Sequence, residues 1–191
     1  MAVFKTRYVL RAAAAVLLGA ALTACASTSA PIASRNPLPP VWSDPSSPVD
    51  PYAPPRIVEG ATPLQCVPFA RSASGVEIYG DANTWWQQAE GRYPRSSSPA
   101  PGSVLVLRGY NDPGRGHVAV VSAIVSARVI RVDQANWLNQ GEITLSVPVM
   151  DVSPNNDWTE VRVWYIPTND WGVRIYQAEG FIHAFALQPF A

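Results

Sequence analysis

Five stretches rich in β-branched residues run through the second half of the chain and limit the folds open to it. They occupy residues 103–107, 117–125, 128–134, 142–147 and 160–166. Valine, isoleucine and threonine favour extended strands, and the turn sequence at 111–114 (Asn-Asp-Pro-Gly) separates the first two stretches. Two earlier segments predict helices, one at 66–72 and one at 81–90 with Asp81 as N-cap.

Helices followed by a run of strands predict an α+β domain in which N-terminal helices pack on an antiparallel β-sheet. Pro68 is compatible with the first helix because it falls in the first turn, where backbone N–H groups have no partner. Residues 91–102 are rich in Gly, Pro and Ser and predict a loop. The tail at 168–191 is apolar enough to pack on the sheet, as one more strand.

The first 24 residues have the pattern of a signal peptide. Lys5, Arg7 and Arg11 form a positive start, and a short apolar run from 12 to 22 follows. The sequence Leu-Thr-Ala-Cys at 22–25 resembles the lipobox of bacterial lipoproteins. That resemblance implies acylation of Cys25, for example with palmitate, and a membrane anchor; an ordinary cleaved signal in which Cys25 has no role is the alternative.

Residues 26 and 27, Ala and Ser, lack the Asp that often marks retention at the inner membrane. The lipobox resemblance therefore implies a place in the cell envelope at the periplasmic face of the outer membrane. Residues 25–60 predict a Pro/Ser-rich tether, since recurrent prolines exclude helices and favour extended chain. At roughly 3 Å per residue this tether could reach about 100 Å. The folded domain is expected at 61–191.

The charge balance argues against a nucleic-acid partner. All fourteen acidic residues follow the predicted signal peptide, whereas three of the fourteen basic residues precede its end, which leaves 11 basic and 14 acidic groups. A net charge of −3 does not provide the basic surface that nucleic acid requires. Seven Trp and seven Tyr indicate a packed domain with room for an aromatic-lined groove.

Cys66 is the candidate nucleophile. If Cys25 is acylated, Cys66 has no partner within the chain, and a lone thiol in an oxidising compartment is a liability unless it is used. The predicted helix would begin at Cys66, where the helix dipole stabilises a thiolate. Gln65 could donate an amide hydrogen bond to a developing oxyanion. A buried inert cysteine, or a disulfide with Cys25 in an unprocessed chain, is the alternative.

His117 is the candidate general base. It opens the apolar run of the second predicted strand, so the sheet would fix it while it faces a cleft, and an ordinary histidine titrates near neutral pH. A surface histidine at a strand end is the alternative. The only other histidine, His183, lies between apolar residues and reads as structural.

A third group should orient the imidazole, and the candidates lie at 133–136. Strand alternation puts Gln134 and Asn136 on the face that carries the apolar residues, and Asp133 on the opposite face. Asn136 or Gln134 is therefore better placed than Asp133, although a bulge near the strand end would reverse that choice.

Five segments in order resemble the CHAP family, the cysteine, histidine-dependent amidohydrolases/peptidases of the papain-like clan. They are 65–70 (Gln-Cys-Val-Pro-Phe-Ala), 80–85 (Gly-Asp-Ala-Asn-Thr-Trp), 101–104 (Pro-Gly-Ser-Val), 116–121 (Gly-His-Val-Ala-Val-Val) and 134–137 (Gln-Ala-Asn-Trp). The resemblance covers about 61–140. One departure matters: the family's usual glutamate is Gln134 here.

The resemblance implies a papain-like fold, a Cys66–His117 dyad and cleavage of peptide or amide bonds in peptidoglycan stem peptides, as an endopeptidase or an N-acetylmuramoyl-alanine amidase. No cofactor is implied, and two histidines with one usable thiol predict no metal site. Two other functions stay open: a non-catalytic wall-binding lipoprotein, and an amidase that acts on a small glutathione-like amide.

Overall fold

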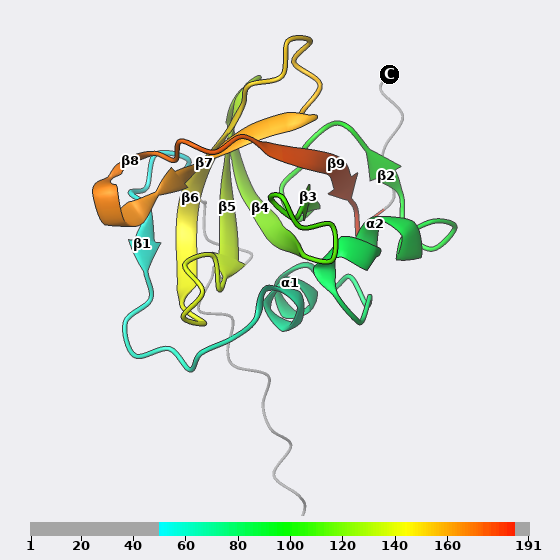
Figure 1. The fold of residues 1–191 in the computed structure, drawn as a ribbon, viewed down its shortest axis with the longest axis horizontal. Coiled ribbons are helices and arrows are strands. Elements are labelled where there is room, and N and C mark those ends of the chain that lie inside the picture. Colours follow the sequence, from blue (N-terminus) through cyan, green and yellow to red (C-terminus); the bar gives the residue numbers. More distant parts are fainter. Residues whose placement is uncertain (1–49, 186–191) are drawn as a thin grey trace, which may run out of the picture. The chain divides into compact units, whose positions relative to one another are not determined.

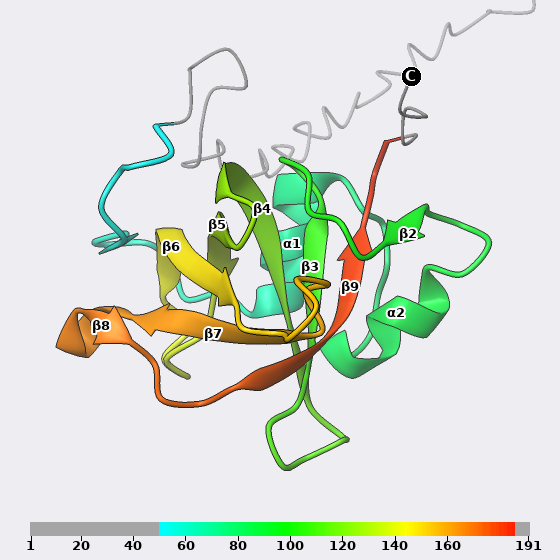
Figure 2. The same ribbon diagram turned by 90° about the horizontal axis from the view of Figure 1, so that it is seen from above.

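The computed structural model describes residues 50–185, and Figures 1 and 2 show it in two views. The predicted signal peptide, Cys25 and most of the predicted tether lie outside these residues. The elements are β1 (Arg56–Ile57), α1 (Cys66–Ser74), η1 (Ala82–Thr84), α2 (Trp85–Gln88), β2 (Arg95–Ser96), β3 (Val104–Arg108), β4 (Gly116–Ser126), β5 (Val129–Ala135), β6 (Ile143–Asp151), β7 (Glu160–Tyr165), η2 (Ile166–Thr168), β8 (Asp170–Trp171) and β9 (Tyr176–Ile182). Here η marks a short 3₁₀ helix.

Six of the strands close into an antiparallel barrel. The order is β6-β5-β4-β3-β9-β7, and β7 pairs back onto β6, with Val149 opposite Val163. The predicted α+β, papain-like arrangement of N-terminal helices packed on an antiparallel sheet is therefore wrong. The described residues are mostly β, and their helices are too short and too few to form a layer of their own.

The barrel strands are apolar on both faces because they separate two hydrophobic cores. Inside the barrel, Leu105 and Leu107 of β3 pack with Ala119 and Val121 of β4. The alternate residues of the same strands, such as Val118, point outward into a second core shared with α1 and α2. This double burial explains why the strands read as continuous apolar runs rather than as an alternation.

Helix α1 forms as predicted, begins at Cys66 and lies against β4 and β5 on the outside of the barrel (Figure 1). It buries Phe69 and ends at Gly75, whose φ of 76° and N–H bond to the Arg71 carbonyl form a left-handed cap. The second predicted helix is shorter than expected. Asp81 precedes the 3₁₀ turn η1, but its side chain forms no capping bond.

The ends of the described chain join the sheet. Strand β1, at residues that the sequence assigned to the tether, pairs with β6. The tail supplies β9, which lies between β3 and β7 and supports the prediction of one more strand. The β3–β4 connection projects from one end of the barrel (Figure 2). In the described part of the chain no helix combines the length and apolarity needed to cross a bilayer.

Candidate active site

Cys66 is the first residue of α1, so its sulfur lies among backbone N–H groups that the helix leaves without partners. The backbone amides of Val118, Val67 and Cys66 itself favour the thiolate and act to lower the pKa of Cys66. Burial nevertheless raises the pKa of the Cys66 thiol above its ordinary value, and these three amides offset only part of that effect. The thiol is therefore protonated at neutral pH and needs a base in order to attack.

His117 is the second residue of β4, on the inward side of the alternation that includes Ala119. Its Nε2 lies 2.9 Å from Oε1 of Gln134. Because that amide oxygen can only accept, Nε2 carries the proton, and Nδ1 of the neutral ring keeps its lone pair. Burial lowers the pKa of His117 to about 4, and the bond to Gln134 raises it only in part.

Gln134 is the group that touches the histidine ring. Its side chain is 1% exposed, and among the described residues its Nε2 atom has no hydrogen-bond partner. The β5–β6 pairing shifts register between Val132 and Gln134, with Ser146 of β6 at a φ of 57°. Despite this irregularity the Gln134 side chain still faces His117. The inward position that strand alternation predicted for Gln134 is therefore the one observed.

Asp133 points to the other face of β5, as its place in the alternation predicted. Its Oδ1 accepts the backbone N–H of Ser146 at 2.8 Å, and burial raises the pKa of its carboxyl. The structure does not bring Asp133 to the histidine.

Asn136 contacts Gln65 instead of His117. Its Nδ2 donates to Oε1 of Gln65 at 2.7 Å, while its Oδ1 accepts the N–H of Gly141 at 2.8 Å. The left-handed φ of 61° at Asn136 ends the strand and turns the side chain toward the start of α1. Because the Gln65 carbonyl is engaged, the Gln65 amide nitrogen is the end left to donate.

A cleft of about 750 Å³ contains both predicted catalytic side chains. Cys66, His117, Gln65 and Asn136 line it, and Gln134 lies behind His117 without lining it. The opposite wall comes from β7, β8 and the segment that leads into β9. His183 lies elsewhere; it is buried, and its Nε2 is 2.9 Å from Ser96 Oγ.

A row of aromatic rings leads away from His117 along the cleft. Trp137 contacts the imidazole edge-on at 4.8 Å between ring centroids, Tyr176 contacts Trp137 at 5.1 Å, and Tyr110 contacts Tyr176 at 5.6 Å. Trp137 packs against the core inside the barrel and also lines the cleft. The composition indicated an aromatic groove, but no local pattern marked Tyr176 or Tyr110 as members.

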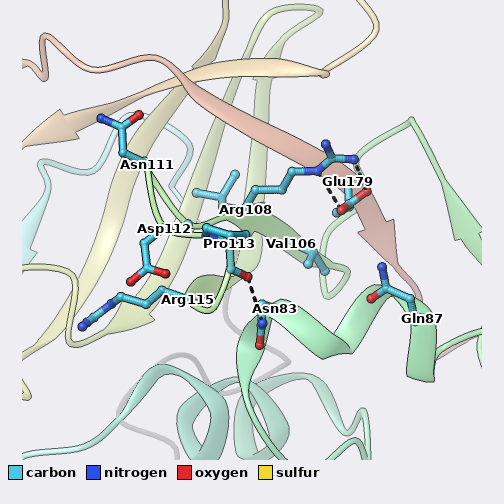
Figure 3. A pocket seen from close by; sticks show the side chains of 11 residues that line it. Asn83, Gln87, Val106, Arg108, Asn111, Asp112, Pro113, Arg115 and Glu179 are labelled. Atoms are coloured by element: carbon cyan, nitrogen blue, oxygen red, sulfur yellow. Dashed lines mark hydrogen bonds and ion pairs between the residues drawn. The ribbon is translucent and has the colours of Figure 1, made fainter.

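A second hollow of about 400 Å³ lies beside the cleft, bordered by the β3–β4 connection (Figure 3). Neither Cys66 nor His117 lines it. Figure 3 shows two fixed contacts there, the Arg108–Glu179 ion pair and the bond from Asn83 Nδ2 to the Pro113 carbonyl at 3.1 Å. This hollow has no nucleophile, so the larger cleft is the candidate active site. Among residues 50–185 no three His, Cys, Asp or Glu side chains gather as metal ligands would.

The arrangement has the parts that acyl transfer by a thiol requires. A cysteine at a helix N-terminus, a histidine with a free ring nitrogen and an amide donor beside the cysteine share one open cleft. A polar group lies behind that histidine and bonds to its ring. Residues 58–136 match the family model of the CHAP domain. No curated protein and no solved structure shows significant similarity to the chain.

Proposed function

We propose that this protein is a cysteine amidohydrolase that cleaves peptide or amide bonds of peptidoglycan, as an endopeptidase or an N-acetylmuramoyl-alanine amidase. One observation carries the proposal: Cys66 and His117 line the same cleft within the segment that matches the CHAP domain. CHAP domains are typically cysteine/histidine amidohydrolases.

In the acylation step, His117 Nδ1 takes the thiol proton while the Cys66 sulfur forms a bond to the carbonyl carbon of the substrate. General-base assistance at the moment of attack fits a thiol whose pKa is raised and an imidazole whose pKa is lowered, since both are neutral at pH 7. The proton then passes from His117 to the leaving amine as the C–N bond breaks. Gln134 keeps the ring oriented through Nε2.

The carbonyl oxygen becomes an oxyanion during this step. The backbone N–H of Cys66 and the amide nitrogen of Gln65 are the donors proposed to bind it, and Asn136 fixes the orientation of Gln65. Water then attacks the thioester carbonyl while His117 takes its proton, the C–S bond breaks, and the proton returns to the Cys66 sulfur as the product leaves with a free carboxyl group.

The proposed location is the periplasmic face of the outer membrane. Acylation of Cys25 would anchor the chain there, and the part of the predicted tether that precedes β1 would hold the catalytic domain away from the membrane. Labelling with a radioactive fatty acid, compared between the wild type and Cys25→Ser, tests this placement; equal labelling would rule the anchor out.

A zymogram on purified peptidoglycan tests the activity. Wild-type protein should clear the wall material, and Cys66→Ala should not, while both unfold at the same temperature. Clearing by the Cys66→Ala protein would remove Cys66 as the nucleophile. Mass spectrometry of the released fragments identifies the bond.

The presence of glutamine at position 134 favours one second candidate function, that of a wall-binding lipoprotein without enzymatic activity. A glutamine cannot supply the negative charge that would stabilise an imidazolium, and burial already lowers the pKa of His117. Co-sedimentation with intact peptidoglycan, without release of fragments, would support this candidate over the enzyme.

A further inference from the structure

The charged side chains that line the cleft are all basic. Arg108, Arg115 and Arg174 line it, and among the described residues no Asp or Glu does. The whole chain has equal numbers of acidic and basic groups. The cleft is therefore positively charged, although the whole chain has no net charge. A local positive charge of this kind attracts an anion to one site.

Two of these arginines are free to bind a ligand. Arg108 is neutralised by Glu179, whose two carboxylate oxygens accept from Nε at 2.8 Å and from Nη2 at 3.0 Å. In the described part of the chain no carboxylate forms an ion pair with Arg115 or Arg174. Figure 3 shows Arg115 extending away from the Arg108–Glu179 pair.

The two free arginines stand at different distances from the reaction centre. Arg115 is the residue directly before β4, two positions before His117 in the chain, and marks the near end. Arg174 marks the far end, because its guanidinium lies over the Tyr110 ring at 4.9 Å, beyond the aromatic row that starts at His117.

The contacts between successive side chains of this row put Arg174 no more than roughly 20 Å from the imidazole, which about six residues of extended peptide would span.

The segment that carries Arg174 is held in place. Arg162 of β7 donates from Nε to the Gly172 carbonyl at 2.8 Å, and Gly172 itself donates to the Val163 carbonyl at 3.0 Å. The cation–π contact with Tyr110 joins this segment to the β3–β4 connection on the other wall. Arg174 is thus presented at a fixed place.

We propose that Arg115 and Arg174 are carboxylate-binding residues, and that the cleft selects short peptides with free carboxylates over peptides whose carboxylates are amidated. The inference rests on the proposed function, because stem peptides are short and carry free carboxylates that some walls convert to carboxamides. The aromatic row supplies the apolar wall between the two arginines, and each arginine can form a paired contact with one carboxylate.

Binding to an inactive protein tests this separately from hydrolysis. Full-length Cys66→Ala protein is titrated by calorimetry with a soluble disaccharide-tetrapeptide that has free carboxylates, and with the same compound in carboxamide form. The acid should bind about tenfold more tightly. Arg174→Gln and Arg115→Gln should each reduce that preference. Arg56→Gln removes the same charge from an exposed site on β1 outside the cleft, and should keep it.

Equal affinity for the two forms, or a preference that survives both cleft substitutions, would overturn the carboxylate sites. That result would leave the proposed function standing if wild-type protein still hydrolyses muropeptides. If the wild-type protein does not hydrolyse muropeptides but still prefers the acid form, the carboxylate-binding sites are supported and the proposed enzymatic activity is rejected.

Discussion

The Nε2 atom of His117 lies 2.9 Å from the Oε1 atom of Gln134, and this contact determines how the proposed dyad can work. A glutamine orients the ring as a carboxylate would, yet it adds no negative charge. The imidazole stays neutral, with a pKa of about 4, and the thiol stays protonated. The resting site is a neutral pair, in contrast to a preformed thiolate–imidazolium pair.

Gln134→Glu should raise the pKa of His117, because a carboxylate beside Nε2 stabilises the imidazolium. In the wild type, kcat/KM should decrease as the pH is lowered through about 4, where His117 takes up its proton. In the variant this decrease should move to higher pH by one unit or more. A pH profile on a soluble muropeptide measures both, and a wild-type decrease near pH 6.5, or one that does not move, contradicts the neutral pair.

Asn136→Asp should weaken catalysis through Gln65. Aspartate keeps an oxygen for the Gly141 N–H but cannot donate to the Gln65 carbonyl, so it would draw the Gln65 amide nitrogen toward itself and away from the oxyanion. Loss of one oxyanion donor lowers kcat by about 100-fold or more. We expect Asn136→Asp to lower kcat at least tenfold with little change in KM.

A double-mutant cycle decides whether Asn136 acts through Gln65. Asn136→Asp should add almost nothing to Gln65→Ala, since the group that it positions is already gone. Fully additive effects on kcat would mean that Asn136 acts on another part of the site.

Local patterns in the sequence predicted most of the elements and the relevant face of β5. The helix at Cys66, the five strands and the inward position of Gln134 all follow from residue preferences and alternation over a few residues. The choice between Gln134 and Asn136 was beyond that reasoning, because it depends on the left-handed φ of 61° at Asn136, which directs its side chain to Gln65.

The closed barrel could not be predicted in the same way. Closure rests on the pairing of β6 with β7 and on the insertion of β9 between β3 and β7, and both are contacts between segments far apart in the chain. Strands that are apolar on both faces suit an open sheet covered by helices as well as a barrel. The far wall of the cleft, including Tyr176 and Arg174, was missed for the same reason.

Stability should depend on pH through His117. Its pKa is about 4 in the folded chain and 6.5 ordinarily, so below pH 6.5 the unfolded chain binds a proton that the folded chain does not. The free energy of unfolding should therefore decrease as the pH is lowered from 7 to 4, and this group should account for about 3 kcal/mol of the decrease. Urea unfolding of the wild type and of His117→Gln at both pH values isolates the contribution of His117. A difference in unfolding free energy between the two proteins that is the same at both pH values would contradict the lowered pKa.

Gly116→Ala should destabilise the fold and disturb His117, which is the next residue. A Cβ at Gly116 would lie 2.6 Å from the Asn83 backbone nitrogen and 2.9 Å from Asn83 Cα, and backbone atoms cannot yield as a flexible side chain can. We expect a loss of about 1–3 kcal/mol of unfolding free energy, with a larger loss of kcat/KM than stability alone explains.

Gly114→Ala is the matched control, because its Cβ would first meet the Asp112 carboxylate oxygen at 3.3 Å, the end of an exposed side chain. Thermal unfolding and muropeptide hydrolysis of the two variants measure the difference. Equal, small effects at both positions would show that the close approach of β4 to η1 does not hold the histidine in place.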